Sequence, residues 1–152
     1  MKRFAVALLL MLHGCGYVGD PLPPALNIPE PIGDLRVTQR GDRLLLAFTL
    51  PAITTEGLGI SRRGEIELRV GPMPATGSAF NIDSWAASAN RLIVIPPTEG
   101  EAVELQEPAT PFAGTELVVA VRTASPKGRW SGWSNVVTSV SYTHLTLPTN
   151  RE

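Results

Sequence analysis

The sequence predicts an all-β protein, built as an antiparallel β-sandwich of about seven short strands. Segments in which aliphatic and polar residues alternate recur along the chain, and a period of two is typical of strands with one buried face. Turn-forming residues separate these segments, and the 152 residues include 14 Gly and 14 Pro. Many short strands with frequent turns favour a sandwich over a helical bundle. The single cysteine excludes an internal disulfide.

The first 14 residues are predicted to be a signal peptide. Lys2 and Arg3 form a basic start, and an apolar segment from residue 4 to residue 12 follows them. As a helix, this segment would reach only about 14 Å, well short of the ~30 Å hydrocarbon core of a bilayer. A secretory signal is therefore favoured over a membrane-spanning anchor.

Leu12-His13-Gly14-Cys15, at the end of the apolar segment, resembles the bacterial lipobox. The resemblance implies attachment of diacylglycerol to the thiol of Cys15 and cleavage between Gly14 and Cys15. An ordinary signal peptide that happens to end near a cysteine is the alternative. Gly16 follows the cysteine, which resembles an outer-membrane sorting signal. We therefore expect a lipid-anchored protein of the bacterial cell envelope, at the outer membrane and facing the periplasm or the cell surface.

Residues 15–33 are expected to form a tether behind the lipid. Residues 16–33 contain five prolines, which oppose a helix and favour an extended, polyproline-like chain. At about 3.1 Å per residue, such a chain spans up to roughly 55 Å. The tether is either a stiff stalk that holds the domain away from the membrane or a disordered leader whose last residues pack beside the first strand.

Three strands are expected to follow the tether. Residues 34–38 alternate, and Gly41 marks the turn after them. The second strand places an apolar row on one face: Leu44, Leu46, Phe48 and Leu50. Residues 65–70 alternate three charged with three aliphatic side chains. We expect Glu65 and Glu67 to share the solvated outer face of that strand, because charges are rarely buried.

The middle of the domain is expected to hold one helical turn and two further strands. Asp83 is placed to cap a short helix over residues 83–90. Residues 91–95 are expected to form the next strand. Residues 101–106 are expected to form another, because aliphatic and polar side chains alternate in them.

The chain closes with a predicted pair of strands. Residues 116–122 have the alternation of a half-buried strand, residues 125–128 form a turn cluster, and a β-branched run covers residues 136–138. Five side chains from these and the earlier strands are expected to face the core: Leu46, Phe48, Leu68, Val119 and Val121.

The two closing segments, with the Trp-Ser-Gly-Trp-Ser run of residues 130–134 between them, resemble the last strands of a fibronectin type III domain. The resemblance implies that residues 34–140 form a sandwich of that kind. Phe48 stands where the family usually has its core Trp. Leu117 stands where the family usually has a Tyr, so the hydrogen bond of that Tyr is absent.

The Trp-Ser-Gly-Trp-Ser run also resembles the signature of class I cytokine receptors, in which arginine side chains stack between tryptophan rings. Here Arg122 and Arg129 match Trp130 and Trp133. We predict a ladder of these four side chains that stiffens the last strand, each guanidinium-indole contact contributing about 0.5–2 kcal/mol. The alternative is an aromatic platform for a sugar or a peptide. A receptor role is not expected, because a lipobox is present and a cysteine-bridged partner domain is absent from the sequence.

Four cations are expected to gather at one pole of the sandwich: Arg62, Arg63, Lys127 and Arg129. Strand alternation places the loops over residues 51–64 and 125–132 at the same pole as the tether. Glu56 is the only acid in these two loops. We expect this pole to face the membrane and to be attracted to anionic head groups or lipopolysaccharide phosphates. Ordinary solvated loop charge is the alternative.

The residues of the mature domain exclude most catalytic sites. Without residues 1–14 and 141–152 the chain has no His, and lipid occupies its only Cys. A Ser-His-Asp site, a Cys-His site or a His/Cys zinc site therefore cannot form. The sequence has no Gly-rich phosphate loop and no Asp-rich calcium loop, and its formal charge of −1 gives no attraction to nucleic acid. We expect no enzyme activity and no cofactor.

Residues 141–152 are expected not to belong to the natural protein. The run VSYTHLTLPT, which starts at Val140, resembles the translation of a transposase adapter used in sequencing libraries. A genuine tail of low order is the alternative. If the run is an adapter, the native chain continues past Val140.

These features predict a lipid-anchored, non-catalytic envelope protein whose domain serves as an interaction or spacer module. Its partners would be the membrane, through the anchor, and an envelope protein or a glycan. The alternative is a carbohydrate-binding accessory domain, possibly part of a longer protein, that uses Trp85, Trp130 or Trp133.

Overall fold

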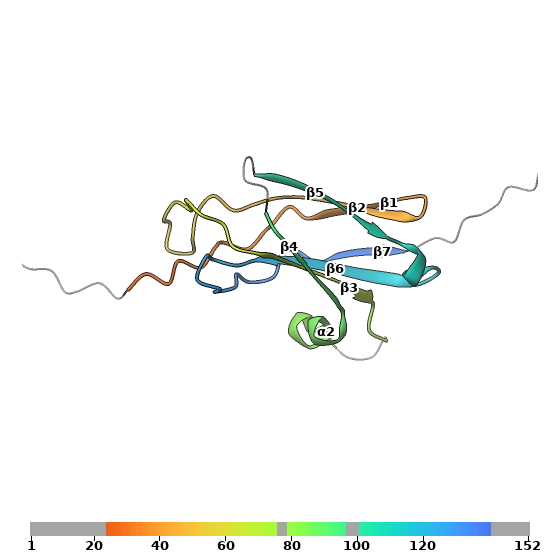
Figure 1. Ribbon diagram of the computed structural model, residues 1–152. Coiled ribbons are helices and arrows are strands. Elements are labelled where there is room, and N and C mark those ends of the chain that lie inside the picture. The colour runs from red at the N-terminus through yellow and green to blue at the C-terminus, as the bar shows by residue number, and fades with distance from the viewer. Residues whose placement is uncertain (1–23, 76–78, 97–100, 141–152) are drawn as a thin grey trace, which may run out of the picture.

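The computed structural model describes residues 24–75, 79–96 and 101–140. Within them, seven strands form two antiparallel sheets that pack face to face (Figure 1). The three-stranded sheet has the order β1 (Arg36–Arg40), β2 (Arg43–Thr49) and β5 (Ala102–Pro108). The four-stranded sheet has the order β4 (Asn90–Val94), β3 (Ile66–Pro72), β6 (Glu116–Thr123) and β7 (Val137–Val140). The described residues thus form an antiparallel β-sandwich of seven strands, as predicted.

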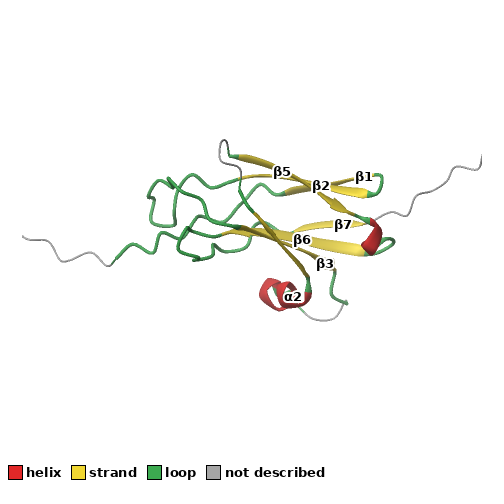
Figure 2. Cartoon of the chain, viewed as in Figure 1, coloured by secondary structure: helices red, strands yellow, loops and turns green. Residues whose placement is uncertain are grey.

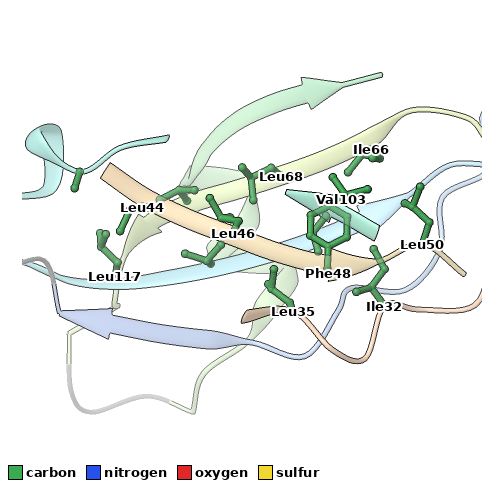
Figure 3. Close-up of a cluster of buried hydrophobic side chains, with 14 residues drawn as sticks. Ile32, Leu35, Leu44, Leu46, Phe48, Leu50, Ile66, Leu68, Val103 and Leu117 are labelled. Carbon is green, nitrogen blue, oxygen red and sulfur yellow. The ribbon is translucent and has the colours of Figure 1, made fainter. Parts of the chain in front are cut away.

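The hydrophobic core lies between the two sheets (Figure 3). The apolar row of β2 points into it, and Leu50 continues that row just past the end of the strand. Alternate residues of β3 and β6 meet this row from the opposite sheet. The predicted inward direction is confirmed for all five residues expected to face the core: Leu46, Phe48, Leu68, Val119 and Val121.

The segment before β1 packs on the domain. Ile32 is only 2% exposed and belongs to the core. The Glu30 N–H donates to the Ile53 carbonyl at 3.1 Å, and the Thr55 N–H donates to the Ile28 carbonyl at 2.9 Å. The part of the expected tether that the structure describes is thus hydrogen-bonded to the sandwich from Leu26 onward.

A short helix, α2 (Ile82–Ser88), precedes β4, and a 3-10 turn, η1 (Thr110–Phe112), precedes β6. The expected capping residue of α2 was wrong. Asn81, not Asp83, is the N-cap, because its side-chain carbonyl accepts the free N–H of Ser84 at 2.9 Å. Asp83 lies in the first turn instead. Among the described residues, no helix is both long and apolar enough to cross a membrane.

The outer face of the four-stranded sheet is covered over β6 and around Glu67 of β3. Helix α2 lies against this face (Figure 2). Trp85 on the helix covers Val118 and Ala120 of β6, both fully buried, in a second hydrophobic cluster. The expectation that this strand is half-buried was therefore wrong: both of its faces are covered. The expectation of a solvated outer face was also wrong for Glu67 on β3, whose side chain is 0% exposed.

Candidate functional site

Glu67 is a residue of β3, and its side chain lies on the outer face of the four-stranded sheet. Strand β3 lies between β4 and β6. In the ladder Glu67 is opposite Arg122 of β6 on one side and Ile93 of β4 on the other. Side chains two residues apart on a strand point to the same face. Arg69 of β3 and Arg91 of β4 therefore share the face of Glu67, and the register places three arginines around one carboxylate.

Each guanidinium donates directly to the Glu67 carboxylate. Oε1 accepts Nε of Arg69 and Nε of Arg91, both at 2.8 Å, and Nη2 of Arg69 lies 2.6 Å from the same oxygen. Oε2 accepts Nε of Arg122 at 2.8 Å, with Nη2 of Arg122 at 2.7 Å. Both carboxylate oxygens thus have charged donors, which is the condition under which a carboxylate tolerates burial.

The guanidinium of Arg122 is stacked between two indole rings. Its Cζ lies 5.0 Å from the ring centroid of Trp130 and 4.2 Å from that of Trp133. The structure thus brings together three of the four residues of the expected ladder. Arg129 lies outside the stack, because its Nη1 donates to the Leu26 carbonyl at 3.2 Å.

The two serines of the Trp-Ser-Gly-Trp-Ser run dock the run onto β6. The Ser131 N–H donates to the Thr123 carbonyl at 2.8 Å, and the Thr123 N–H donates back to Ser131 Oγ at 3.1 Å. Ser134 repeats both bonds with Val121, at 2.8 and 3.1 Å. The hydroxyls thus replace backbone carbonyls as acceptors. This docking holds the two neighbouring tryptophan rings beside the outer face of β6, where they reach Arg122.

The stack is joined to helix α2 at two points. Trp133 Nε1 donates to Asp83 Oδ1 at 3.0 Å, and the Trp133 ring packs on the cluster around Trp85. Arg69 Nη1 donates to the carbonyl of Ala89, the C-cap residue of the helix, at 3.0 Å. We call Glu67, Arg69, Arg91, Arg122, Trp130 and Trp133 the arginine-tryptophan face. The face is one bonded network across three strands, a loop and a helix.

Trp85 is not available as part of an aromatic platform. Its side chain is buried, and Nε1 donates to the Pro72 carbonyl at 3.1 Å. Trp130 and Trp133 are half-buried, and each ring has Arg122 against it. The three tryptophans proposed for sugar binding thus already make contacts within the protein.

The ionised form of Glu67 is favoured. Burial alone raises the pKa of Glu67, but hydrogen bonds from Arg122, Arg91 and Arg69 oppose it and hold that pKa below its ordinary value of 4.5. The pKa of Asp34 is also lowered, chiefly because its carboxylate accepts the N–H and O–H of Thr49.

The lowered pKa values predict a loss of stability in acid. A carboxylate whose pKa is depressed by folding stabilises the folded state fully above its unfolded pKa, and this stabilisation is lost as the pH falls through the folded pKa. For Glu67 we expect the loss to begin near pH 4.5 and to grow below it. Urea unfolding of the full chain between pH 7 and pH 3 measures it. Asp34→Asn serves as the control, because it removes the other depressed carboxylate. If this variant abolishes all acid sensitivity, Glu67 does not contribute.

The two loops of the expected basic pole lie side by side at one end of the sandwich. Arg62 and Lys127, from the two loops, line one hollow together with Asn27. The described chain enters at this pole: the N–H groups of Leu26 and Asn27 donate to the Glu56 carboxylate at 2.9 and 3.1 Å. This pole lies at the left of Figure 1.

Acidic residues from outside the two loops also lie at this pole. Arg63 Nη2 lies 3.7 Å from Oε1 of Glu101, the residue just before β5. Glu65 lines a second hollow with Arg62 and Arg63. The sandwich thus brings two further acids, Glu65 and Glu101, to the pole that holds the four cations. The described residues contain no cluster of three side chains of the kind that binds a metal ion.

Comparisons with known proteins identify no family for this chain. No family model matches it, and no curated protein matches it. The chain is similar to the solution structure of the third fibronectin III domain of the human KIAA0343 protein. The match has 12% identity and a TM-score of 0.47, and it covers 90% of this chain and 100% of that one.

Proposed function

We propose that this protein is a lipid-anchored, non-catalytic module of the bacterial envelope that acts as a spacer or an interaction domain. The placement of the described chain ends carries the spacer role. The chain enters beside Arg129 and Glu56, and it leaves β7 at the opposite pole (Figure 1). Strand β6 alone has eight residues, or about 26 Å at ~3.3 Å per residue. The domain therefore separates its two ends by at least the length of a strand.

The arginine-tryptophan face supports a mechanical role. A spacer transmits position only when its sheet, loops and helix move together. Here Glu67 connects β3, β4 and β6, and Trp133 connects the last loop to Asp83 on α2. Such bonds hold the outer layer of the domain in one arrangement.

The carbohydrate-binding alternative is less well supported by the geometry. It depends on tryptophan rings that can stack on a sugar, and Trp85 is buried while Trp130 and Trp133 contact Arg122. Interaction through the surface of the sandwich does not depend on free aromatic rings. We therefore retain the spacer or interaction role.

The proposed orientation follows from the entry point of the chain. Leu26 and Asn27 lie at the basic pole, so the lipid on Cys15 would hold this pole toward the bilayer. Attraction of the four cations to anionic head groups would add to the anchor. The ion pair between Arg63 and Glu101 reduces this contribution.

The anchor is tested with Cys15→Ser in the host bacterium. Each CH₂ group of a lipid contributes about 0.8 kcal/mol to membrane binding when it is buried in the bilayer. A protein therefore needs two or more acyl groups to stay stably on a membrane. We expect the wild-type chain to incorporate labelled palmitate and to sediment with membranes, and the variant to do neither as mature protein. His13→Ala is the matched control. It places a small residue at position 13 of the lipobox and keeps Cys15, so it should behave as wild type. Membrane sedimentation of mature Cys15→Ser protein would refute the anchor.

A further inference from the structure

Strand β4 is an edge strand of the four-stranded sheet (Figure 1). Leu92 and Ile93 within the strand are 40% and 37% exposed, and Ile95 just beyond it is 84% exposed. An exposed edge with aliphatic side chains is a template for pairing with another strand.

The other edges lack this combination. The exposed side chains of β1 are Arg36, Thr38 and Arg40, and those within β5 include Glu104 and Gln106. Polar and charged side chains of this kind discourage strand addition. Strand β7 has Val140 exposed at its end, but it lies beside β1 of the other sheet. Among the four edges, β4 thus has an aliphatic surface without that protection.

The backbone of β4 is also available. Its residues Asn90–Val94 pair with β3 along one side only. In an antiparallel ladder, alternate residues of an edge strand turn their N–H and C=O groups away from the sheet. The described part of the chain provides no other backbone partner for residues 90–95. A peptide in extended conformation would satisfy these groups.

The charge beside this edge is positive. Glu67 neutralises one of the three arginines that surround it, which leaves a charge of +2, and inclusion of nearby Asp83 leaves +1. Arg91 is the arginine on β4, and its side chain is 50% exposed. Its hydrogen bond to Glu67 uses Nε. Because the guanidinium is half exposed, it can also donate to a carboxylate from outside.

We propose that β4 binds an extended acidic peptide segment of a partner protein as an added strand. This proposal names a class of partner for the interaction module, so it rests on the proposed function. An antiparallel peptide would place a Glu or Asp opposite Arg91 and aliphatic side chains opposite Leu92 and Ile93. Backbone hydrogen bonds would supply affinity, and the carboxylate would supply the preference for an acidic sequence.

Charge disfavours a second copy of this chain as the occupant. Two antiparallel β4 strands would bring two arginine clusters of the same sign to one continuous sheet face. Like charges close together across strands are destabilising. An acidic peptide avoids this repulsion and makes opposite-charge contacts instead.

The test uses the purified chain in detergent and the fluorescein-labelled peptide TVTVLET. In the antiparallel register the Glu of this peptide lies opposite Arg91, and its Leu lies opposite Leu92. Fluorescence anisotropy is followed with protein up to about 1 mM, so that weak binding is also measured. We expect binding of TVTVLET and at least threefold weaker binding of TVTVLKT. Hydrogen exchange of the complex should show new protection in β4.

Two variants locate the site. Arg91→Gln should weaken binding of TVTVLET roughly two- to fivefold and reduce its preference over TVTVLKT, as expected for loss of one cross-strand ion pair. Ile93→Thr keeps a β-branched residue and should weaken binding of both peptides. Arg36→Gln, on the β1 edge of the other sheet, is the matched control and should change nothing. Thermal unfolding of each variant verifies that it is folded.

Several results would overturn the proposal: no binding of TVTVLET, equal binding of both peptides, or protection at β1, β5 or β7 instead of β4. Concentration-dependent dimerisation that Ile93→Thr abolishes would also overturn it, in favour of self-pairing. The assay does not involve the lipid. A negative result here therefore leaves the outcome for Cys15→Ser unaffected, and loss of the anchor leaves peptide binding measurable.

Discussion

Glu67→Gln is expected to lower the free energy of unfolding by about 3 kcal/mol, since removal of one partner from a buried ion pair typically costs about 3–5 kcal/mol. The substitution leaves three guanidinium groups around a neutral amide that cannot balance their charge. The lower end of the range applies because Arg91 is half exposed and water can reach it. A loss of this size is a large part of the stability of a small domain, about 5–15 kcal/mol in total. Urea unfolding at pH 7, followed by tryptophan fluorescence, measures it.

Glu65→Gln is the matched control for this experiment. Glu65 lies two residues before Glu67 and is exposed. Its substitution should change stability by no more than about 0.5 kcal/mol, as is usual for surface positions. Equal effects of the two substitutions would contradict the special role of the buried carboxylate. Arg122→Gln should also destabilise the domain, because it removes the ion pair and both indole contacts together.

Phe48→Ala is expected to cost about 3–5 kcal/mol, the usual range for truncating a buried phenylalanine. The ring is 3% exposed and lies in the centre of the core between the sheets (Figure 3). Its removal forfeits the transfer free energy of the ring and leaves a cavity that the two sheets could close only by moving closer together. Urea unfolding at neutral pH measures the loss, with an unchanged m-value as the check that the denatured state is unaffected.

Phe80→Ala provides the comparison at an exposed site. Phe80 is 42% exposed, and its ring centroid lies 6.2 Å from that of Trp85. Loss of this single aromatic contact should cost no more than about 1.5 kcal/mol. A cost under 1 kcal/mol for Phe48→Ala would show that β2 presents its other face to the core.

Strand positions could be predicted because the signal for them is local. The alternation along β2 depends only on neighbouring residues, and the row from Leu44 to Leu50 faces the core as expected. The same holds for β5. The ends of elements were harder to predict, because capping depends on one side-chain rotamer. Asn81 rather than Asp83 caps α2 for this reason.

Only part of the arginine-tryptophan face was predicted from the sequence. The Trp-Ser-Gly-Trp-Ser run indicated a stack with Arg122, and the structure contains that stack. Glu67, Arg69 and Arg91 were missed as its partners. An arginine two residues after Glu67 on the same strand was the available local signal, since such residues share a face. Arg91 had no local signal, because its position beside Glu67 depends on the pairing of β3 with β4.

The sequence by itself determined the all-β sandwich, its apolar row on each core strand and the gathering of the two loops at the entry pole. These follow from the period of two and from strand alternation, which act over a few residues at a time. Tertiary structure alone decided that Glu67 is buried, that both faces of β6 are covered, and that Glu101 reaches Arg63. In each case the deciding contact joins segments far apart in the chain. Glu67 and Arg122 are separated by 55 positions, and only the register of the folded sheet determines that their charges meet.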